Sequence, residues 1–368
     1  MTFIISFGIM TGNSASTIRS IVMFFLFILA GLWGRTYDML TGAALSAAVL
    51  LLKQPLYIYH SGFLLSFGAV TGIALLVPAV ERMLPEESVT ESMILNRSRK
   101  EKAVRSLKQK VKSSMIASLS ISLATLPVQL YFFYTFPLYS VFLNLFIIPL
   151  MGILMAAGAA GLFLSCLVPL WSGIFMMPCK WILQICEGLC RIFDALPGGN
   201  PVLGKPRLWQ IVLYYGLLLW MLFMKETSGK KFFGKKFFGK ACSGKSCFKE
   251  KIFGKWLLRK RNLHGKQRIC ILLAGIFLLC IRPRGATALT MLDIGQGDCM
   301  VIEEKSGYNI LVDGGSSDVS EAGRYRIIPY LKSHGIDSLD YVFVSHADSD
   351  HISGILEMLQ RREKKKLK

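Results

Sequence analysis

Four side chains that can bind a metal ion lie within six residues near the end of the sequence: His346, Asp348, Asp350 and His351. They follow the apolar run Tyr341–Val344, which we predict to be a strand. In an extended segment side chains alternate, so His346, Asp348 and Asp350 would project to one side, and His351 could join them where a helix begins. Imidazole and carboxylate ligands suit zinc, manganese or iron, and a pair of such ions can activate water for hydrolysis. The alternative is a polar surface loop.

A further carboxylate, Asp313, follows the predicted strand Asn309–Val312 and precedes two glycines. At the end of a neighbouring strand it could orient one of the metal ligands as a second-shell group. The elements expected to position these segments are short β runs and helices, which predicts an α/β region. They are the strands Ala288–Asp293, Cys299–Glu304 and Tyr341–Val344 and the helices Ile327–His334 and Ile352–Leu359.

The rest of the chain is too apolar for an ordinary soluble protein, with 53% hydrophobic residues and a mean hydropathy of +0.47. Its apolar runs are long enough to cross about 30 Å of hydrocarbon, and we predict seven to eight transmembrane helices. Six runs are Ser20–Gly34, Met39–Leu52, Gly62–Val80, Ser114–Phe136, Ser140–Leu170 and Leu208–Met224; a more amphipathic run, Trp171–Leu196, and a short one, Ile269–Ile281, complete the set.

Positive charge is concentrated in two hydrophilic segments of a chain whose net charge is +20. Lys225–Arg268 holds fifteen Lys and Arg against two Glu, and Arg82–Lys112 holds nine against four. The positive-inside rule places both in the cytoplasm, and the four predicted spans between them keep them on one side. The span Ile269–Ile281 would then carry everything after about Gly285 to the extracytoplasmic side. We interpret the basic segments as topology determinants near anionic lipid rather than as nucleic-acid sites.

These patterns divide the chain into a helical membrane domain (1–224), a basic linker with a last span (225–285) and a C-terminal region (286–368). The linker carries a five-residue repeat, Lys230–Lys240, which suits either an anionic membrane surface or a low-complexity linker. Two polar residues of the predicted spans, Gln129 and Asn144, could line a pathway or pack between helices. The nine cysteines indicate no disulfide framework.

Two sets of segments resemble one known family. His346–His351 reads HisAlaAspSerAspHis and resembles the HxHxDH signature of the metallo-β-lactamase superfamily, with Asp348 in place of the second His. The family concerned is ComEC, the bacterial DNA-internalisation channels of natural competence. Its β-lactamase-like domain is similar to Leu292–Asp298, Ile310–Gly315 and Gly335–Asp340, and its membrane domain is similar to Ser16–Ser20, Gly34–Asp38, Gly62–Ile73 and Val141–Pro149, with Leu64 where Gln is usual.

The resemblance implies an all-α polytopic membrane domain followed by an incomplete α/β metallo-β-lactamase-like domain. It implies that His346 and Asp348 serve one metal ion and that Asp350 and His351 serve the other, with Asp350 also handling the proton of the attacking water. The cofactor would be a divalent metal, Zn or Mn, and a two-metal site is expected only in a complete domain. The carboxylate of Asp348 admits manganese more readily than a second imidazole would.

We expect this chain to be truncated at both ends relative to the family. Met1–Met10 resembles the tail of an earlier apolar helix and carries no signal peptide, and Lys368 precedes the further His ligands that the superfamily uses. A split gene, a fragment or a decayed remnant would each explain this. We therefore expect no nuclease activity from this chain alone.

The function implied is that of a channel component for uptake of single-stranded DNA across the bacterial cytoplasmic membrane during transformation. The expected partners are single-stranded DNA, cytoplasmic membrane lipid, other competence proteins and the product of an adjacent gene fragment. The alternatives are a membrane-anchored metal-dependent phosphodiesterase or nuclease, and a remnant without function.

Overall fold

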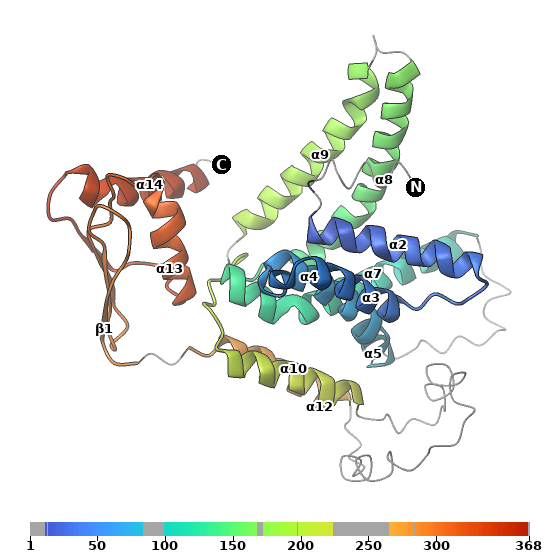
Figure 1. Ribbon diagram of the computed structural model, residues 1–368, viewed down its shortest axis with the longest axis horizontal. Helices are drawn as coiled ribbons and strands as arrows, with labels where there is room; N and C mark the ends of the chain where they lie inside the picture. The colour runs from blue at the N-terminus through green and yellow to red at the C-terminus, as the bar shows by residue number, and fades with distance from the viewer. Residues whose placement is uncertain are drawn as a thin grey trace. The chain divides into compact units, whose positions relative to one another are not determined.

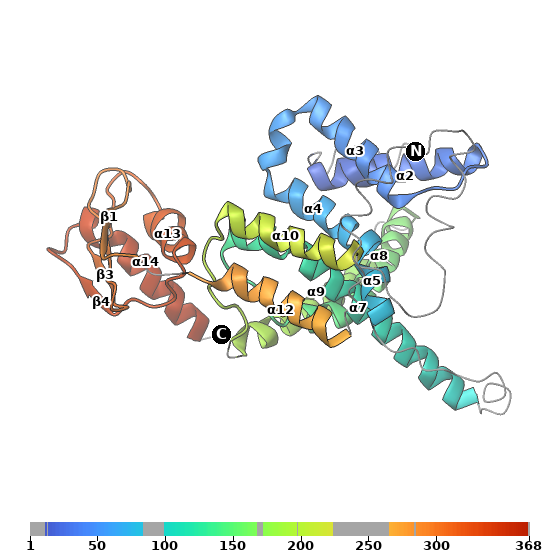
Figure 2. The ribbon, with the colours of Figure 1, turned by 90° about the horizontal axis from the view of Figure 1, so that it is seen from below.

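The fold was analysed in a computed structural model, which describes residue 12 and residues 14–83, 99–167, 172–196, 198–223, 265–282 and 285–366. The apolar tail Met1–Met10 and the repeat Lys230–Lys240 lie outside these residues. The chain forms two compact units, one of Met1–Arg207 with Cys280–Lys368 and one of Leu208–Leu279. Each unit is treated separately (Figures 1 and 2).

The first helices begin at residues that can cap them. Helix α2 (Ala15–Leu32) starts after Ser14, whose hydroxyl accepts a hydrogen bond from the Thr17 amide. Helix α3 (Met39–Lys53) starts after Asp38, whose carboxylate accepts from both the amide and the hydroxyl of Thr41. These bonds satisfy amides that have no partner within the first turn of a helix. The two helices pack against each other, and a short 3₁₀ turn η1 (Pro55–Tyr59) follows them.

The predicted span Gly62–Val80 is continuous but not uniform. Helix α4 (Ser61–Thr71) passes through a π-helical turn η2 (Gly72–Leu76) into α5 (Val77–Met83). At Gly72 the backbone lies against helix α7 (Arg99–Phe133), and a Cβ there would be 2.7 Å from the Ala124 Cβ and 3.1 Å from the Ser120 carbonyl oxygen. Close packing at this glycine therefore coincides with the wider π-helical turn.

Helix α7 begins earlier than the predicted span Ser114–Phe136. It starts at Arg99, so the end of the basic segment Arg82–Lys112 is helical and continuous with the membrane span. Pro127 lies within the helix. A membrane helix tolerates proline because neighbouring helices and local adjustments satisfy the freed backbone groups, and Pro127 is fully buried here.

Helices α8 (Ser140–Leu167) and α9 (Ser172–Ala195) pack side by side, as Figure 1 shows. No residue in the most apolar stretch of α8 is buried inside the protein, which suits a helix whose side chains face lipid. Helix α9 is amphipathic, and its exposed residues Glu187 and Arg191 form an ion pair one turn apart. Helix α8 approaches α9 at Gly158, where an added Cβ would lie 3.9 Å from the Cys179 Sγ, whereas a Cβ added at Gly152 would meet nothing within 4 Å.

Within the described residues, four helical segments are long and apolar enough to cross a membrane: Ala15–Leu32, Ser61–Glu81, Lys108–Phe133 and Ser140–Ser165. Three shorter apolar helices, Met39–Lys53, Leu208–Leu222 and Cys270–Cys280, accompany them. The predicted number of seven to eight spans is therefore not confirmed. Helix α9 is not among the four, because Lys180, Glu187 and Arg191 interrupt its apolar sequence.

The second unit is a pair of helices, α10 (Leu208–Phe223) and α12 (Gly265–Cys280). The buried Gln210 side chain donates from Nε2 to the Leu278 carbonyl oxygen over 2.8 Å, and a Cβ at Gly275 would lie 3.3 Å from the Tyr214 ring. A buried amide paired with a main-chain carbonyl avoids an unsatisfied polar group within an apolar helix pair.

The C-terminal region forms a four-stranded sheet in the order β1-β2-β3-β4 (Ala288–Met291, Met300–Glu303, Asn309–Val312, Tyr341–Phe343). The first three strands are antiparallel neighbours, and β4 lies parallel to β3. The crossover between β3 and β4 contains a π-helical turn η4 (Gly323–Ile327) and helix α13 (Ile328–Ser333). All four strands fall within the apolar runs predicted from the sequence.

One face of this sheet is covered by helices. Val301 and Leu311, which are opposite each other on β2 and β3, are fully buried against Ile327 and against Leu331 of α13 and Ile355 of α14 (Ser349–Lys366). Figure 2 shows α13 and α14 beside the sheet. Because α14 packs on this core, its first turn lies at the ends of β3 and β4.

Candidate metal centre

The candidate metal ligands come from the ends of two adjacent strands and the helix that follows. Strands β3 and β4 are parallel, with Val312 opposite Phe343, so the residues after each strand lie next to each other. The Asp313 amide continues this pairing by donating to the Phe343 carbonyl oxygen over 2.8 Å. His346 follows β4 after Val344 and Ser345, and Asp350 and His351 lie in the first turn of α14.

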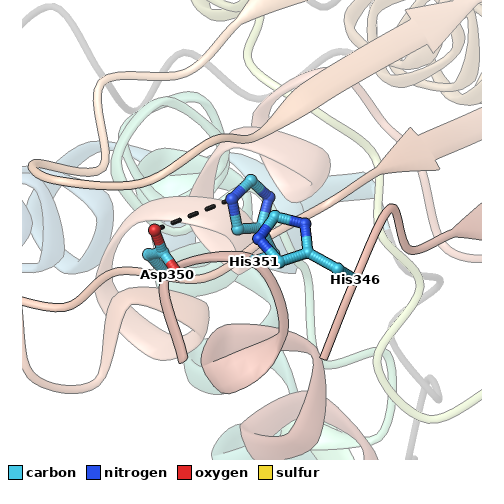
Figure 3. Close-up of side chains that lie close together, drawn as sticks. All are labelled: His346, Asp350 and His351. Atoms are coloured by element: carbon cyan, nitrogen blue, oxygen red, sulfur yellow. Dashed lines mark ion pairs between the residues drawn. The ribbon is translucent and has the colours of Figure 1, made fainter. Parts of the chain in front are cut away.

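Three of the four predicted ligands come together. His346, Asp350 and His351 each offer one ligand atom, and these atoms all lie within 4.8 Å of one another. Figure 3 shows the two imidazole rings next to each other, with ring centroids 3.8 Å apart, and the Asp350 carboxylate 3.6 Å from Nε2 of His351. Two imidazoles and a carboxylate are a donor set that fits a divalent metal such as zinc or manganese.

Asp348, the fourth predicted ligand, lies outside that group of three. Its carboxylate is 78% exposed and lies 3.5 Å from Nε2 of His346. The strand-like alternation expected for His346, Asp348 and Asp350 does not extend through the segment, because α14 already begins at Ser349. The pairing of His346 with Asp348 and of Asp350 with His351 at two metals stays a prediction.

Asp313 is held by several hydrogen bonds. It is 4% exposed, and its two carboxylate oxygens accept from the amide of Ser345 at 2.7 Å and from the hydroxyl of the same residue at 2.8 Å. Its Oδ2 also lies 3.1 Å from Nδ1 of His351. A backbone φ of +54°, rare for a residue other than glycine, aims this carboxylate at the neighbouring strand end.

Ser345 belongs to this site, although it was not among the residues predicted from the sequence. Its hydroxyl donates to Asp313 and lies 2.9 Å from Nδ1 of His346 and 3.3 Å from Nδ1 of His351. If the proton of each imidazole is on Nδ1, where it can be donated to Ser345 or Asp313, each Nε2 keeps a lone pair for a metal ion. In the sequence Ser345 stands directly before His346. That position alone does not indicate whether its hydroxyl contacts the metal ligands.

Electrostatic interactions couple Asp313 to His351. Burial would by itself raise the pKa of the Asp313 carboxyl, but the hydrogen bonds from Ser345 and His351 outweigh it and hold the pKa below its ordinary value. The hydrogen bond to Asp313 raises the pKa of the His351 imidazole against the opposing effect of burial. The charges of Asp350, Asp313 and Asp298 raise it further. The surroundings of His351 therefore favour a positive charge, either a proton or a metal ion.

Two loops fix the first turn of α14 by main-chain hydrogen bonds. The Asp298 amide donates to the Asp350 carbonyl oxygen at 3.2 Å, and the Gly314 amide donates to the His351 carbonyl oxygen at 2.8 Å. Gly315 permits this approach, since a Cβ there would lie 2.5 Å from the Ser349 carbonyl oxygen. The positions of Asp350 and His351 are thus set by the backbone of the loops after β1 and β3.

Asp318 holds these two loops together and was also missed from the sequence. Its Oδ1 accepts from the Gln296 amide at 2.7 Å and from the Ser316 hydroxyl at 2.8 Å. The bond from Gln296 is the main reason that the pKa of Asp318 lies below its ordinary value. Burial raises the pKa of the Cys299 thiol to about 12, so this thiol is protonated at neutral pH in the metal-free protein.

The two polar residues predicted to line a pathway differ in their contacts. Asn144 of α8 donates from Nδ2 to the Ser118 hydroxyl of α7 over 3.0 Å. Gln129 of α7 is half-buried. The Asn144 bond is what helix packing alone requires, so a role in a pathway stays a prediction for both residues.

The helical region and this site define a membrane protein that carries a metallo-β-lactamase-like region. Residues 1–228 match the family model described as Competence protein, and residues 292–368 match the model described as Metallo-beta-lactamase superfamily. ComE operon protein 3 of Bacillus subtilis (strain 168) is 25% identical over 389 residues, covering 100% of this chain and 42% of that protein. The chain thus spans less than half the length of this curated relative. No solved structure matches the chain.

The competence match covers well over half of the sequence, and the relative spans both regions. The chain belongs to the ComEC family of competence proteins.

Proposed function

We propose that this chain is a channel component through which single-stranded DNA crosses the bacterial cytoplasmic membrane during natural transformation. The observation that carries the proposal is the competence match over residues 1–228, which coincides with the apolar helices. DNA and membrane lipid are the partners that this family suggests. Other competence proteins and the product of an adjacent gene are further proposed partners.

Deletion of the chromosomal locus with complementation by the chain tests this proposal. Transformation frequency and uptake of labelled DNA into a nuclease-resistant cytoplasmic pool are measured in parallel. We expect both to fall by orders of magnitude in the deletion strain. A deletion strain that takes up DNA normally would contradict the proposal.

We further propose that the protein is multi-pass and that residues after Gly285 lie outside the cytoplasm. The support is the positive-inside rule applied to the two basic segments. The side depends on whether α9 crosses the bilayer, since its charged residues also suit an interfacial position. Labelling a cysteine placed at the exposed Asp293 with a membrane-impermeant thiol reagent in intact spheroplasts tests this side. Labelling only after lysis would place the region in the cytoplasm.

His346, Asp350 and His351 are the residues that would hold a divalent metal ion, with Asp348 as an additional ligand. A metal ion bound there would lower the pKa of a coordinated water and so supply a nucleophile at neutral pH. Asp350 is the residue that would accept the proton of that water. Asp313 and Ser345 would fix the ring orientations of the two histidines through the contacts described above.

This cluster also supports a second candidate function, a membrane-anchored metal-dependent phosphodiesterase or nuclease. Two variants distinguish the candidates. His346→Ala should abolish function if the protein is an enzyme, whereas Asn144→Leu should impair uptake more if the helices form the path of the DNA. Purified chain incubated with double-stranded DNA and Mn²⁺ or Zn²⁺ gives a direct assay. Metal-dependent cleavage that His346→Ala removes would favour the enzyme.

A further inference from the structure

An arginine lies between two of the apolar helices. Arg19 is on the second turn of α2, within the candidate span Ala15–Leu32, and it is half-buried. Its Nη1 donates to the Ser66 carbonyl oxygen of α4 over 3.0 Å, and its guanidinium carbon lies 5.7 Å from the centre of the Phe67 ring. The side chain is therefore directed toward α4. A cation placed in an apolar helical region is costly and is typically retained for a function.

No ion pair neutralises Arg19 within the part of the chain that the structure describes. Its Nε is buried and has no hydrogen-bond partner among those residues. A guanidinium has five N–H donors in a planar fork, and the contact with Ser66 uses one of them. The one hydrogen bond to Ser66 is enough to join α2 to α4. It leaves the positive charge without an ion pair among the described residues and the buried Nε without an acceptor, and a bound anion would supply both.

Two hydroxyl groups lie next to this cation. The Ser66 hydroxyl donates to the Ser16 hydroxyl over 3.2 Å, which brings a second side chain from α2 to the same place. Ser16 is exposed, so a ligand can reach the group from outside the helices. A cationic fork beside two hydroxyls is suited to an anion with at least two oxygens, each able to accept a hydrogen bond.

We propose that Arg19, with Ser16 and Ser66, forms a binding site for a backbone phosphodiester of single-stranded DNA. A phosphodiester carries one negative charge and two unesterified oxygens, which the guanidinium fork can bind in a bidentate manner. The assignment to DNA rather than to a lipid headgroup rests on the proposed function. It agrees with the direction of the side chain, because an arginine that reaches for lipid would extend away from α4.

The test uses the full chain in lipid nanodiscs and a fluorescent single-stranded oligothymidylate, with anisotropy measured over a range of salt concentrations. We expect Arg19→Gln, which can still donate to Ser66, to bind about 10-fold more weakly, since it loses a charge-assisted contact. The slope of log affinity against log salt should decrease by about 0.7 for one phosphate lost from a single strand. Arg35→Gln, at an exposed arginine beyond the other end of α2, is the matched control and should change affinity less than about twofold.

Two further variants keep the test decisive if Arg19→Gln fails to fold. Arg19→Lys keeps the charge but loses the fork, so the affinity should fall severalfold with an unchanged salt slope. Ser16→Ala removes a hydroxyl without touching the Ser66 carbonyl contact and should weaken binding by a smaller factor.

The outcomes separate this inference from the proposed function. A wild-type chain that binds no single-stranded DNA overturns both. A wild-type chain that binds DNA, with Arg19→Gln unchanged in affinity and salt slope, overturns the inference alone. Nanodiscs of phosphatidylcholine and of phosphatidylglycerol identify a lipid occupant. If Arg19→Gln alters only the retention of phosphatidylglycerol, measured by native mass spectrometry, the ligand is a headgroup and the inference is wrong.

Discussion

The hydrogen bonding of polar side chains differs between the C-terminal region and the helical region. At the metal centre the Asp313 carboxylate has three partners and the Ser345 hydroxyl contacts three side chains. In the helices several hydroxyl groups make a single hydrogen bond to the preceding turn of their own helix, as when Thr125 donates to the Ile121 carbonyl oxygen and Ser165 donates to the Gly161 carbonyl oxygen. Overlapping bonds fix the orientation of a side chain, whereas a single bond only removes an unsatisfied group. The first arrangement suits a site that must hold a ligand geometry, and the second suits helix packing.

The backbone packing of the two regions differs in the same way. Around the metal centre, loops approach the first turn of α14 so closely that a Cβ at Gly315 would meet backbone atoms at 2.5–2.7 Å. At Gly72, between two helices of the helical region, an added Cβ would meet the Ala124 Cβ at 2.7 Å and the Ser120 carbonyl oxygen at 3.1 Å. All three nearest atoms at Gly315 lie within 2.7 Å and belong to the backbone, against one atom at Gly72, so the C-terminal region should tolerate less change.

Of the changes considered, we therefore expect Gly315→Ala to reduce stability most. The added methyl group cannot fit without moving α14, so we expect a loss of at least about 3 kcal/mol in the stability of the C-terminal region. The rate at which buried Cys299 reacts with a thiol reagent, located by peptide mass spectrometry, reports this unfolding. Gly72→Ala should cost less, and Gly285→Ala, with nothing within 4 Å, is the control. Equal effects at positions 315 and 72 would remove the contrast between the regions.

Asp313→Asn should weaken divalent metal binding about 10- to 100-fold, which is typical when the group that orients a metal ligand is lost. The amide has nearly the same shape but carries no charge to favour the proton on Nδ1 of His351. Calorimetric titration of the full chain with Zn²⁺ or Mn²⁺ measures the change. Asp293→Asn, at a carboxylate that is 89% exposed, is the matched control. Unchanged affinity in Asp313→Asn would show that this carboxylate does not orient the site.

The stability of the metal-free C-terminal region should depend on pH through the same pair. The depressed pKa of Asp313 gives a stabilisation that is present above the ordinary value of 3.8 and is lost as pH falls through the lowered pKa. The raised pKa of His351 gives a stabilisation that is complete below 6.5 and is lost as pH rises through the raised pKa. Pulse proteolysis in EDTA should thus show greatest resistance between about pH 4 and 6.5, with a flatter profile in Asp313→Asn. Identical profiles would rule out the coupling.

The smallest effect is expected in the helices. The hydrogen bond between Asn144 and Ser118 should show a coupling of about 0.6 kcal/mol, the average for such bonds between membrane helices. A double-mutant cycle of Asn144→Ala and Ser118→Ala, measured by unfolding in mixed detergent, gives this value. A coupling of several kcal/mol would mean that these polar side chains are organised as tightly as those of the metal centre.

The sequence predicted the strands of the C-terminal region well, because each apolar run ends at residues that stop a strand, such as the glycines after Asp313. It also indicated four candidate ligands from their local spacing, and the structure brings three of them together. It could not show that α14 begins at Ser349, which separates Asp348 from the other three. Nor could it find Ser345 or Asp318, because their roles depend on partners 22 to 32 residues away.

In the helical region the sequence was informative about apolar length and less so about helix continuity. The basic residues from Arg99 onward suggested a hydrophilic segment outside the span, whereas α7 is continuous from Arg99 to Phe133. Charged side chains do not interrupt a helix, because its backbone hydrogen bonds are made within the helix itself.

The π-helical turn at Gly72–Leu76 has a consequence for changes in chain length. A π turn contains one residue more than a turn of the surrounding α-helix. The extra residue is taken up within the turn, so the side chains of α4 and of α5 that pack on neighbouring helices stay on the same faces. Removing Ile73 should let the turn relax to an α-helix with both faces still in phase. Removing Leu65, inside regular α4, would rotate every following residue by about 100°. Comparison of the expression and melting temperatures of the two deletions would show whether this span can lose a residue at one place only.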